Sequence, residues 1–167
     1  MWFILLQMSS NRVEIIFGSD HAGYELKNRL CNFYALSSHP LVSRVHDAGC
    51  FSNERVDYPD YAKIVATIMK ESGSHKRIGV LVCGTGIGIG IAANRFDHIR
   101  CALCTDTYSA EMSRKHNDAN CISLGARRTS FDECVAILET FLSTEFEGGR
   151  HERRLSKINH LKTMLAD

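Results

Sequence analysis

The stretch Val80-Leu-Val-Cys-Gly-Thr-Gly-Ile-Gly-Ile-Gly-Ile-Ala-Ala-Asn94 decides the fold class. An apolar run of strand length passes into a cysteine, then into four glycines at every second position, then into small residues typical of a helix. Glycines let the backbone approach a bound molecule and turn its N–H groups inward. Ligands of open α/β sheets bind at the carboxyl ends of strands. Cys83 is therefore predicted to stand at a ligand site, where a helix start favours a thiolate and bound anions.

The pattern outward from this stretch alternates strands with helices. Strands are predicted at 13–17, 42–47, 78–82, 99–104 and 121–124, and helices at 22–36, 58–71, up to about 95, at 108–116, from Ser130 onward and at 150–165. Ser130-Phe-Asp-Glu133 is a capping box that opens one of these helices. This alternation predicts an α/β fold, a three-layer α/β/α sandwich around a five-stranded parallel sheet.

The composition is that of an ordinary globular chain. It has 167 residues, 44% of them hydrophobic and 23% charged, with a net charge of +1. A single domain with a full core is expected, and we place it at 13–167, after an N-terminal extension at 1–12. The near-neutral charge argues against nucleic-acid binding. The apolar start at 1–8 is too short to span a membrane.

Seven cysteines are scattered through apolar segments. In a chain with a full core, reduced and mostly buried thiols are the favoured interpretation, which indicates a cytoplasmic protein. Cys101 and Cys104 form a C-x-x-C, but within one strand they are expected to point to opposite faces. Because no second pair at zinc-finger spacing accompanies them, no metal site is expected.

The motif Gly18-Ser-Asp-His-Ala-Gly23 follows the first predicted strand directly. Asp20 and His21 are therefore expected at the same sheet edge as Cys83. An aspartate and a histidine together can handle protons, bind hydroxyls and contact an anion. The alternative is that Asp20 only caps the following helix, and the local residues leave both interpretations open.

Two further motifs lie at helix ends. In D-Y-P-D-Y-A, Tyr58 could offer a phenol to a sugar hydroxyl, while Asp57 could cap the helix, and a helix start is the favoured interpretation of the motif alone. In R-K-H-N-D, His116 and Asn117 end a helix just before the fifth strand. They suit acid chemistry and hydrogen bonding, but a histidine at a helix end can also simply complement the helix dipole.

Three arginines are candidates for an anion site. Arg150 and Arg154 are four residues apart, so they share one helical face and could hold a phosphate together. Arg127, just after the fifth strand, could add a third guanidinium. The alternative is a solvated basic helix, which the neutral overall charge leaves open.

Dinucleotide binding is the main competitor for the glycine stretch. Gly88-Ile-Gly-Ile-Ala-Ala93 matches G-x-G-x-x-A, and Asp106 lies at about the right distance beyond it. The match begins several residues after the strand, however, and the chain leaves no room for a separate substrate domain. A buried structural role for Cys83 is the other alternative, which the adjacent glycines disfavour.

Taken in order, G-S-D-H-A-G, D-Y-P-D-Y-A, C-G-T-G-I-G, R-K-H-N-D-A-N and E-G-G-R-H-E-R-R resemble the type B ribose-5-phosphate isomerases, a family that includes galactose-6-phosphate isomerase subunits. The resemblance covers roughly Val13 to Ile158. It implies a Rossmann-like fold, a homodimer or dimer of dimers with active sites at the subunit interface, and no metal or organic cofactor. The implied reaction interconverts ribose 5-phosphate and ribulose 5-phosphate through a cis-enediolate, in the non-oxidative pentose phosphate pathway.

The resemblance also implies a role for each site residue. Cys83 would be the base that moves a proton between C1 and C2, and His116 the acid that opens the furanose ring. The enediolate oxygens would be held by the Thr85 hydroxyl and by backbone amides from Gly84, Gly86, Ile87 and Gly88. Sugar hydroxyls would be bound by Asp20, Tyr58 and Asn117. The phosphate would be bound by His21, Arg127, Arg150 and Arg154, some of them reaching in from the partner chain.

Three features depart from the family pattern: the extension at 1–12, a long stretch at 31–44, and Gly90, where a small polar residue is frequent. Two alternatives to the ribose 5-phosphate reaction follow. A six-carbon sugar phosphate, of allose or galactose, is the nearer one, because the depth of the pocket decides how long a sugar it accepts and the sequence does not display that depth. A non-catalytic nucleotide-binding module is the more distant one.

Overall fold

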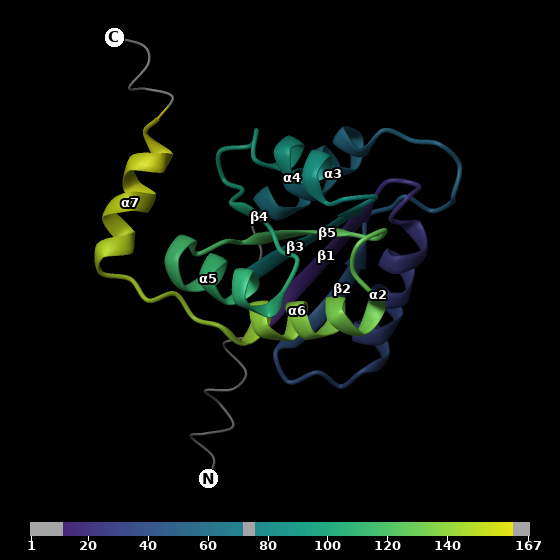
Figure 1. The fold of residues 1–167 in the computed structure, drawn as a ribbon, viewed down its shortest axis with the longest axis horizontal. Helices are drawn as coiled ribbons and strands as arrows, with labels where there is room; N and C mark the ends of the chain where they lie inside the picture. The colour runs from purple at the N-terminus through teal and green to yellow at the C-terminus, as the bar shows by residue number, and fades with distance from the viewer. Residues whose placement is uncertain (1–11, 72–75, 162–167) are drawn as a thin grey trace.

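The computed structural model describes residues 12–71 and 76–161, and it confirms the predicted alternation of strands and helices (Figure 1). The elements in chain order are β1 (Val13–Ser19), α2 (Tyr24–Leu36), β2 (Val42–Asp47), α3 (Tyr58–Lys70), β3 (Lys76–Cys83), α4 (Ile87–Ala93), β4 (Cys101–Leu103), α5 (Thr107–Asn117), β5 (Cys121–Gly125), α6 (Phe131–Ser143) and α7 (Arg150–Asn159). The predicted N-terminal extension up to residue 11 and the end of the predicted last helix, 162–165, lie outside the described residues.

All five strands are parallel, in the order β2-β1-β3-β5-β4. The chain moves to one side of β1 to form β2 and then to the other side to form β3. The crevice between the carboxyl ends of β1 and β3 is therefore the topological switch point of the sheet, where ligands of open α/β folds bind.

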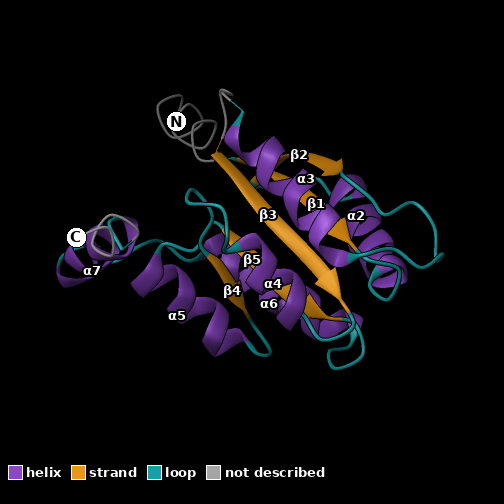
Figure 2. Ribbon diagram, turned by 90° about the horizontal axis from the view of Figure 1, so that it is seen from above, coloured by secondary structure: helices purple, strands orange, loops and turns teal. Residues whose placement is uncertain are grey.

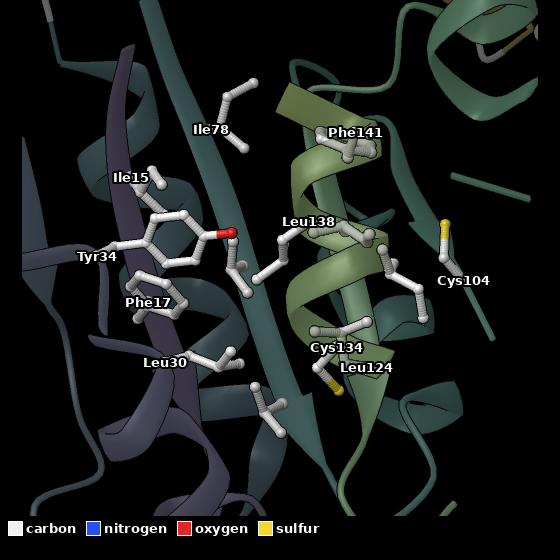
Figure 3. Packing of buried hydrophobic residues seen from close by; sticks show 14 of the residues in the cluster. Ile15, Phe17, Leu30, Tyr34, Ile78, Cys104, Leu124, Cys134, Leu138 and Phe141 are labelled. Carbon is white, nitrogen blue, oxygen red and sulfur yellow. The ribbon is translucent and has the colours of Figure 1, made fainter. Parts of the chain in front are cut away.

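The core lies on both faces of the sheet, because side chains of a strand alternate between faces. Ile15 and Phe17 of β1 pack with residues of α2 and α6, including Tyr34 and Leu138 (Figure 3). Ile16, between them, belongs to a second cluster with residues of α3 and α4. Alternating apolar residues of the strands thus pack against helices on both sides of the sheet, which gives the three layers of the sandwich.

Two helices begin at capping boxes. Ser130 accepts a hydrogen bond from the backbone N–H of Glu133, as predicted for α6. Asp106 does the same for α5 through the backbone N–H of Ser109, at 2.7 Å. Asp57 occupies the N-cap position of α3, where the sequence suggested a cap, but its side chain makes no capping hydrogen bond there.

The last helix, α7, stands apart from the sandwich beyond α5 (Figure 2). An apolar hollow of about 480 Å³ lies between it and the β4 edge of the sheet, lined by Phe96, Ile99 and Ala102 on one side and Leu155 and Ile158 on the other. None of the helices within the described ranges has both the length and the apolarity needed to cross a bilayer.

Candidate functional site

The carboxyl ends of β1, β3 and β5 meet at one edge of the sheet. The backbone N–H of Asp20 donates to the carbonyl of Val82 at 3.2 Å, and that of Ala126 donates to the carbonyl of Cys83 at 2.9 Å. The segments after β1 and β5 are therefore both fastened to the end of β3. Asp20 lies at the same edge as Cys83, as the parallel arrangement predicts.

Cys83 is buried, with 4% of its surface exposed, and a backbone amide points at its sulfur. The N–H of Gly86 lies 3.1 Å from Sγ. Gly86 has φ +78°, and a Cβ at this position would lie 2.6 Å from Leu103 Cδ1, so glycine is required for the turn that starts α4. An N–H···S contact at a helix start stabilises the thiolate form of the cysteine.

Four other thiols are unsuited to acting as bases. Burial raises the pKa of Cys31 to about 12 and the pKa values of Cys104 and Cys134 to about 11. The hydrogen bond that the Cys121 thiol donates to Cys101, and then burial, raise the pKa of Cys121. All seven cysteines are free, as predicted. Cys101 packs against one face of the sheet and Cys104 against the other, so the C-x-x-C does not form a site.

The four glycines after Cys83 do not form one loop, and that expectation is wrong. α4 begins at Ile87, so only two of them precede the helix, whereas Gly88 and Gly90 lie inside it. Both permit close contacts: a Cβ on Gly88 would lie 2.8 Å from Tyr58 Cζ, and one on Gly90 would lie 2.7 Å from Ser123 Oγ. Tyr58 is thereby packed against the first turn of α4.

The helical glycines also remove the basis for the dinucleotide hypothesis. In a dinucleotide fingerprint the glycines form the turn between strand and helix, whereas Gly88 and Gly90 belong to the helix itself. The carboxylate of Asp106, the acidic residue of that match, is instead occupied in capping α5.

Asp20 and His21 are held by the backbone. Asp20 is buried, and its Oδ1 accepts a hydrogen bond from the N–H of Gly23 at 3.0 Å. The N-cap of α2 is Gly23, so Asp20 holds the turn before the helix and does not cap the helix itself. His21 Nδ1 lies 3.2 Å from the carbonyl of Val56. The ring borders a hollow of about 660 Å³ that Arg55 also lines. Sequence reasoning missed Arg55, which stands two residues before the D-Y-P-D-Y-A motif.

Arg127 and Thr85 complete the group around Cys83. The guanidinium carbon of Arg127 lies 3.4 Å from where a Cβ of Gly84 would stand, so this cation covers the backbone beside the thiol. Thr85 is exposed, and its Oγ1 accepts from the N–H of Ile87 at 3.3 Å. The N–H of Ile87 is thus already bound, whereas that of Gly88, also in the first turn of α4, has no partner within its helix and remains available to an oxyanion.

His116 and Asn117 lie at the other edge of the sheet. α5 starts after the carboxyl end of β4 and runs back toward the edge where the strands begin. Arg100, directly before β4, donates from Nε to the carbonyl of Asn117 at 3.0 Å, and from Nη2 to the carbonyl of Asp118 at 2.8 Å. Within one chain, His116 is therefore separated from Cys83 by the length of the sheet.

α7 brings its arginines to His116. The rings of His116 and His151 are stacked, with centroids 4.3 Å apart and planes 8° apart. Arg150 Nε lies 3.2 Å from His151 Nε2, and Arg154 Nη1 lies 3.5 Å from His151 Nδ1. Desolvation, and then the nearby cationic groups His116, Arg150 and Arg154, lower the pKa of His151. Sequence reasoning missed His151 because R-H-E-R-R resembles a solvated basic surface.

Glu147 lies 4.0 Å from His116 Nε2 and 3.7 Å from His151 Nε2, so three potential metal ligands are close together. The arrangement suits a metal ion poorly. The two rings are nearly parallel, so the in-plane lone pairs of their nitrogens run side by side instead of converging on one point. The guanidinium of Arg150 already faces one of these nitrogens.

The predicted site residues thus form two groups in the chain. One group surrounds the thiol and contains Asp20, His21, Tyr58, Cys83, Gly84, Thr85, Gly86, Ile87, Gly88 and Arg127. The other lies on α5 and α7 and contains His116, Asn117, Arg150 and Arg154. The first group offers a base and oxyanion donors, and the second offers an acid and two guanidiniums.

Comparison with known proteins extends this description. The family described as Ribose/Galactose Isomerase matches residues 15–158. Ribose-5-phosphate isomerase B of Escherichia coli is 41% identical over 152 residues, covering 89% of this chain and 96% of that protein. The solved structure of ribose-5-phosphate isomerase B from Clostridium thermocellum has a TM-score of 0.83 at 44% identity, covering 91% of this chain and 99% of that one.

A second solved structure carries a ligand. Ribose-5-phosphate isomerase B from Mycoplasma genitalium, with bound ribulose-5-phosphate, has a TM-score of 0.81 at 35% identity and covers 90% of this chain and 97% of that one. These similarities extend over nearly all of the described fold and include both groups of residues. The chain is an isomerase and belongs to the ribose/galactose isomerase family.

Proposed function

We propose that this protein interconverts ribose 5-phosphate and ribulose 5-phosphate through a cis-enediolate, with Cys83 as the base. The observation that carries the proposal is the buried thiol at the switch point of the sheet, whose sulfur faces the Gly86 amide at 3.1 Å. The thiolate takes the proton from C2 of the open-chain aldose, and the resulting thiol returns it to C1. The relatives that carry this name support the choice of substrate.

The oxyanion donors follow from the start of α4. Charge develops on O1 and O2 as the proton leaves C2, and donors fixed in advance lower the energy of that state. The free N–H groups of the first turn and the Thr85 hydroxyl are suited to this task, with Tyr58 packed against Gly88 at the rim. Asp20, also at this edge, would bind a sugar hydroxyl.

His116 would supply the acid for ring opening. It donates a proton to the ring oxygen O4 as the C1–O4 bond breaks, while the proton of the O1 hydroxyl passes to solvent and the aldehyde forms. Because His116 and Cys83 lie at opposite sheet edges of one chain, we infer that a complete site takes its thiol group from one subunit and His116, Asn117, Arg150 and Arg154 from its partner.

The exposed apolar residues fit such a pairing. Ile87 and Ile91 of α4 and Leu103 of β4 are 41–64% exposed near the thiol edge, and Ile158 of α7 is 48% exposed beside its arginines. Exposed apolar surface of this kind is typical of an interface. A homodimer, or a dimer of dimers, would bury it and bring the two groups together.

The purified protein tests the proposal when it is assayed side by side with ribose 5-phosphate, allose 6-phosphate and galactose 6-phosphate. We expect the highest kcat/KM with ribose 5-phosphate. A preference for a six-carbon phosphate would keep the chemistry but overturn the substrate, and no turnover with any of the three would overturn the reaction.

The phosphate assignment has a matched control on the same helix. Arg150→Ala should raise KM at least tenfold, because charge-assisted hydrogen bonds to a phosphate contribute roughly 1.5–3 kcal/mol. Arg153, one residue before Arg154 and also exposed, does not contact the histidine cluster. Arg153→Ala should leave KM unchanged, and an equal effect of both changes would reject a specific phosphate site.

A further inference from the structure

His151 is the buried member of the cluster on α5 and α7. Its side chain is 4% exposed, against 36% for His116 and 48% for Glu147. The outer ring, that of His116, therefore lies on an inner ring that α7 holds in place. A stacked aromatic neighbour restricts the side-chain rotation of the outer ring and so fixes where its nitrogens point.

The charges around His151 indicate which of the two rings carries a proton. Both of its nitrogens face guanidiniums, those of Arg150 and Arg154, so a proton on His151 would add a third positive charge to the group. A neutral imidazole has one acceptor nitrogen, and Nε2 offers it to Arg150 at 3.2 Å. Glu147 lies near both rings, 4.0 Å from His116 Nε2 and 3.7 Å from His151 Nε2. Because only His151 also faces the two guanidiniums, His116 is the ring better placed to carry a proton.

We propose that His151 is a positioning residue for the ring-opening acid: stacked on His116 and contacted by Arg150 and Arg154, it orients the acid and links its protonation to the phosphate. This inference rests on the proposed function, which places the phosphate on those arginines. A bound dianion offsets their charge, so the histidine pair takes up its proton more readily once substrate is present.

Two variants separate stacking from charge. His151→Phe keeps a ring beneath His116 but removes the nitrogens, whereas His151→Ala removes both. His160→Phe, at the opposite end of the same helix, is the control. We expect His151→Ala to lower kcat for ribose 5-phosphate at least tenfold, a part of the roughly 100-fold or larger contribution of general acids. His151→Phe should recover most of this loss.

Deuterium exchange distinguishes positioning from a structural defect. Ribulose 5-phosphate has no ring to open, so its exchange of a C1 proton with D2O needs the Cys83 base but not the acid. Both His151 variants should keep near-native exchange. An equal loss of exchange and isomerisation would show that His151 only maintains the structure, and unchanged isomerisation in His151→Ala would show that it has no role.

Histidine NMR titration tests the link to phosphate. Adding inorganic phosphate at fixed pH should shift the ring NMR signals of His116 in the native protein, and in His151→Phe this shift should be clearly smaller. An equal shift in both proteins would overturn the link. Failure of the proposed function itself would look different, because the native protein would then show neither isomerisation nor deuterium exchange.

Discussion

At the scale of single residues, the cysteines differ in what surrounds their sulfur atoms. Cys104 and Cys83 are both buried, but burial raises the pKa of Cys104 to about 11, so it stays protonated at neutral pH. Cys83 instead faces the N–H of Gly86 and the start of a helix. A thiolate is stabilised by such a donor and a thiol is not, which makes the two residues a natural pair for comparison.

Cys83→Ala should reduce kcat at least roughly 100-fold, because the general base is lost, while ribose 5-phosphate still binds. Cys104→Ala should leave kcat near native and lower the free energy of unfolding by roughly 1 kcal/mol, because it leaves a small cavity in the core. Steady-state kinetics and thermal unfolding of both variants check this. Near-native turnover of Cys83→Ala would mean that another group is the base.

At the scale of elements, close packing between α3 and α4 positions a predicted sugar-binding residue. The ring of Tyr58, at the first position of α3, lies where a side chain of Gly88 would project from α4. Glycine inside a helix costs stability, so its presence here indicates that the space is needed.

Gly88→Ala should therefore displace Tyr58 and raise KM several-fold, up to the roughly tenfold effect of one lost hydrogen bond. The protein should remain folded, because the gain in helix propensity, up to about 1 kcal/mol, offsets part of the clash. Tyr58→Phe is the control, since it keeps the ring and removes only the hydroxyl. If Gly88→Ala left KM unchanged while Tyr58→Phe raised it, the displacement would be disproved.

Much of the arrangement of strands and helices could be predicted from the sequence. Apolar runs and the Ser130 box located the elements to within a few residues, and the rule for parallel sheets put Asp20 beside Cys83. The position of β5 between β3 and β4 could not be predicted, because apolar patterning says which residues are buried and not which strand is adjacent. The role of His151 could not be predicted for a related reason. Its burial comes from stacking on His116, 35 positions earlier, and local sequence patterns do not reveal contacts over that separation.

At the scale of the whole molecule, the two groups of site residues belong to opposite edges of one sheet. Within the described residues, Cys83, the proposed base, lies in one group, and His116, the proposed acid, lies in the other. The inferred pairing of subunits makes each active site a combination of two chains. Closed two-fold symmetry then gives two such sites in each dimer.

Mixing two inactive variants tests this arrangement. In a hybrid of Cys83→Ala with His116→Ala, one site carries both changes and the other carries neither. With random exchange half of the dimers are hybrids, so activity should recover to about one quarter of the native value. Mixtures of Cys83→Ala with native protein serve as the control for dilution, because their activity should stay at about half of the native value with or without exchange, and a mass tag on one variant reports the exchange itself. No recovery despite proven exchange would mean that each site lies within one chain.

The order of the strands also has a consequence for synthesis of the protein. β4 pairs only with β5, which follows it in the chain, and β5 occupies the place between β3 and β4. A nascent chain that has emerged as far as Leu103 can assemble β2, β1 and β3, but β4 has no strand to join. Translation must therefore continue through Gly125 before the sheet closes, and until then the growing chain exposes the unpaired edge of β3 to other chains and to chaperones.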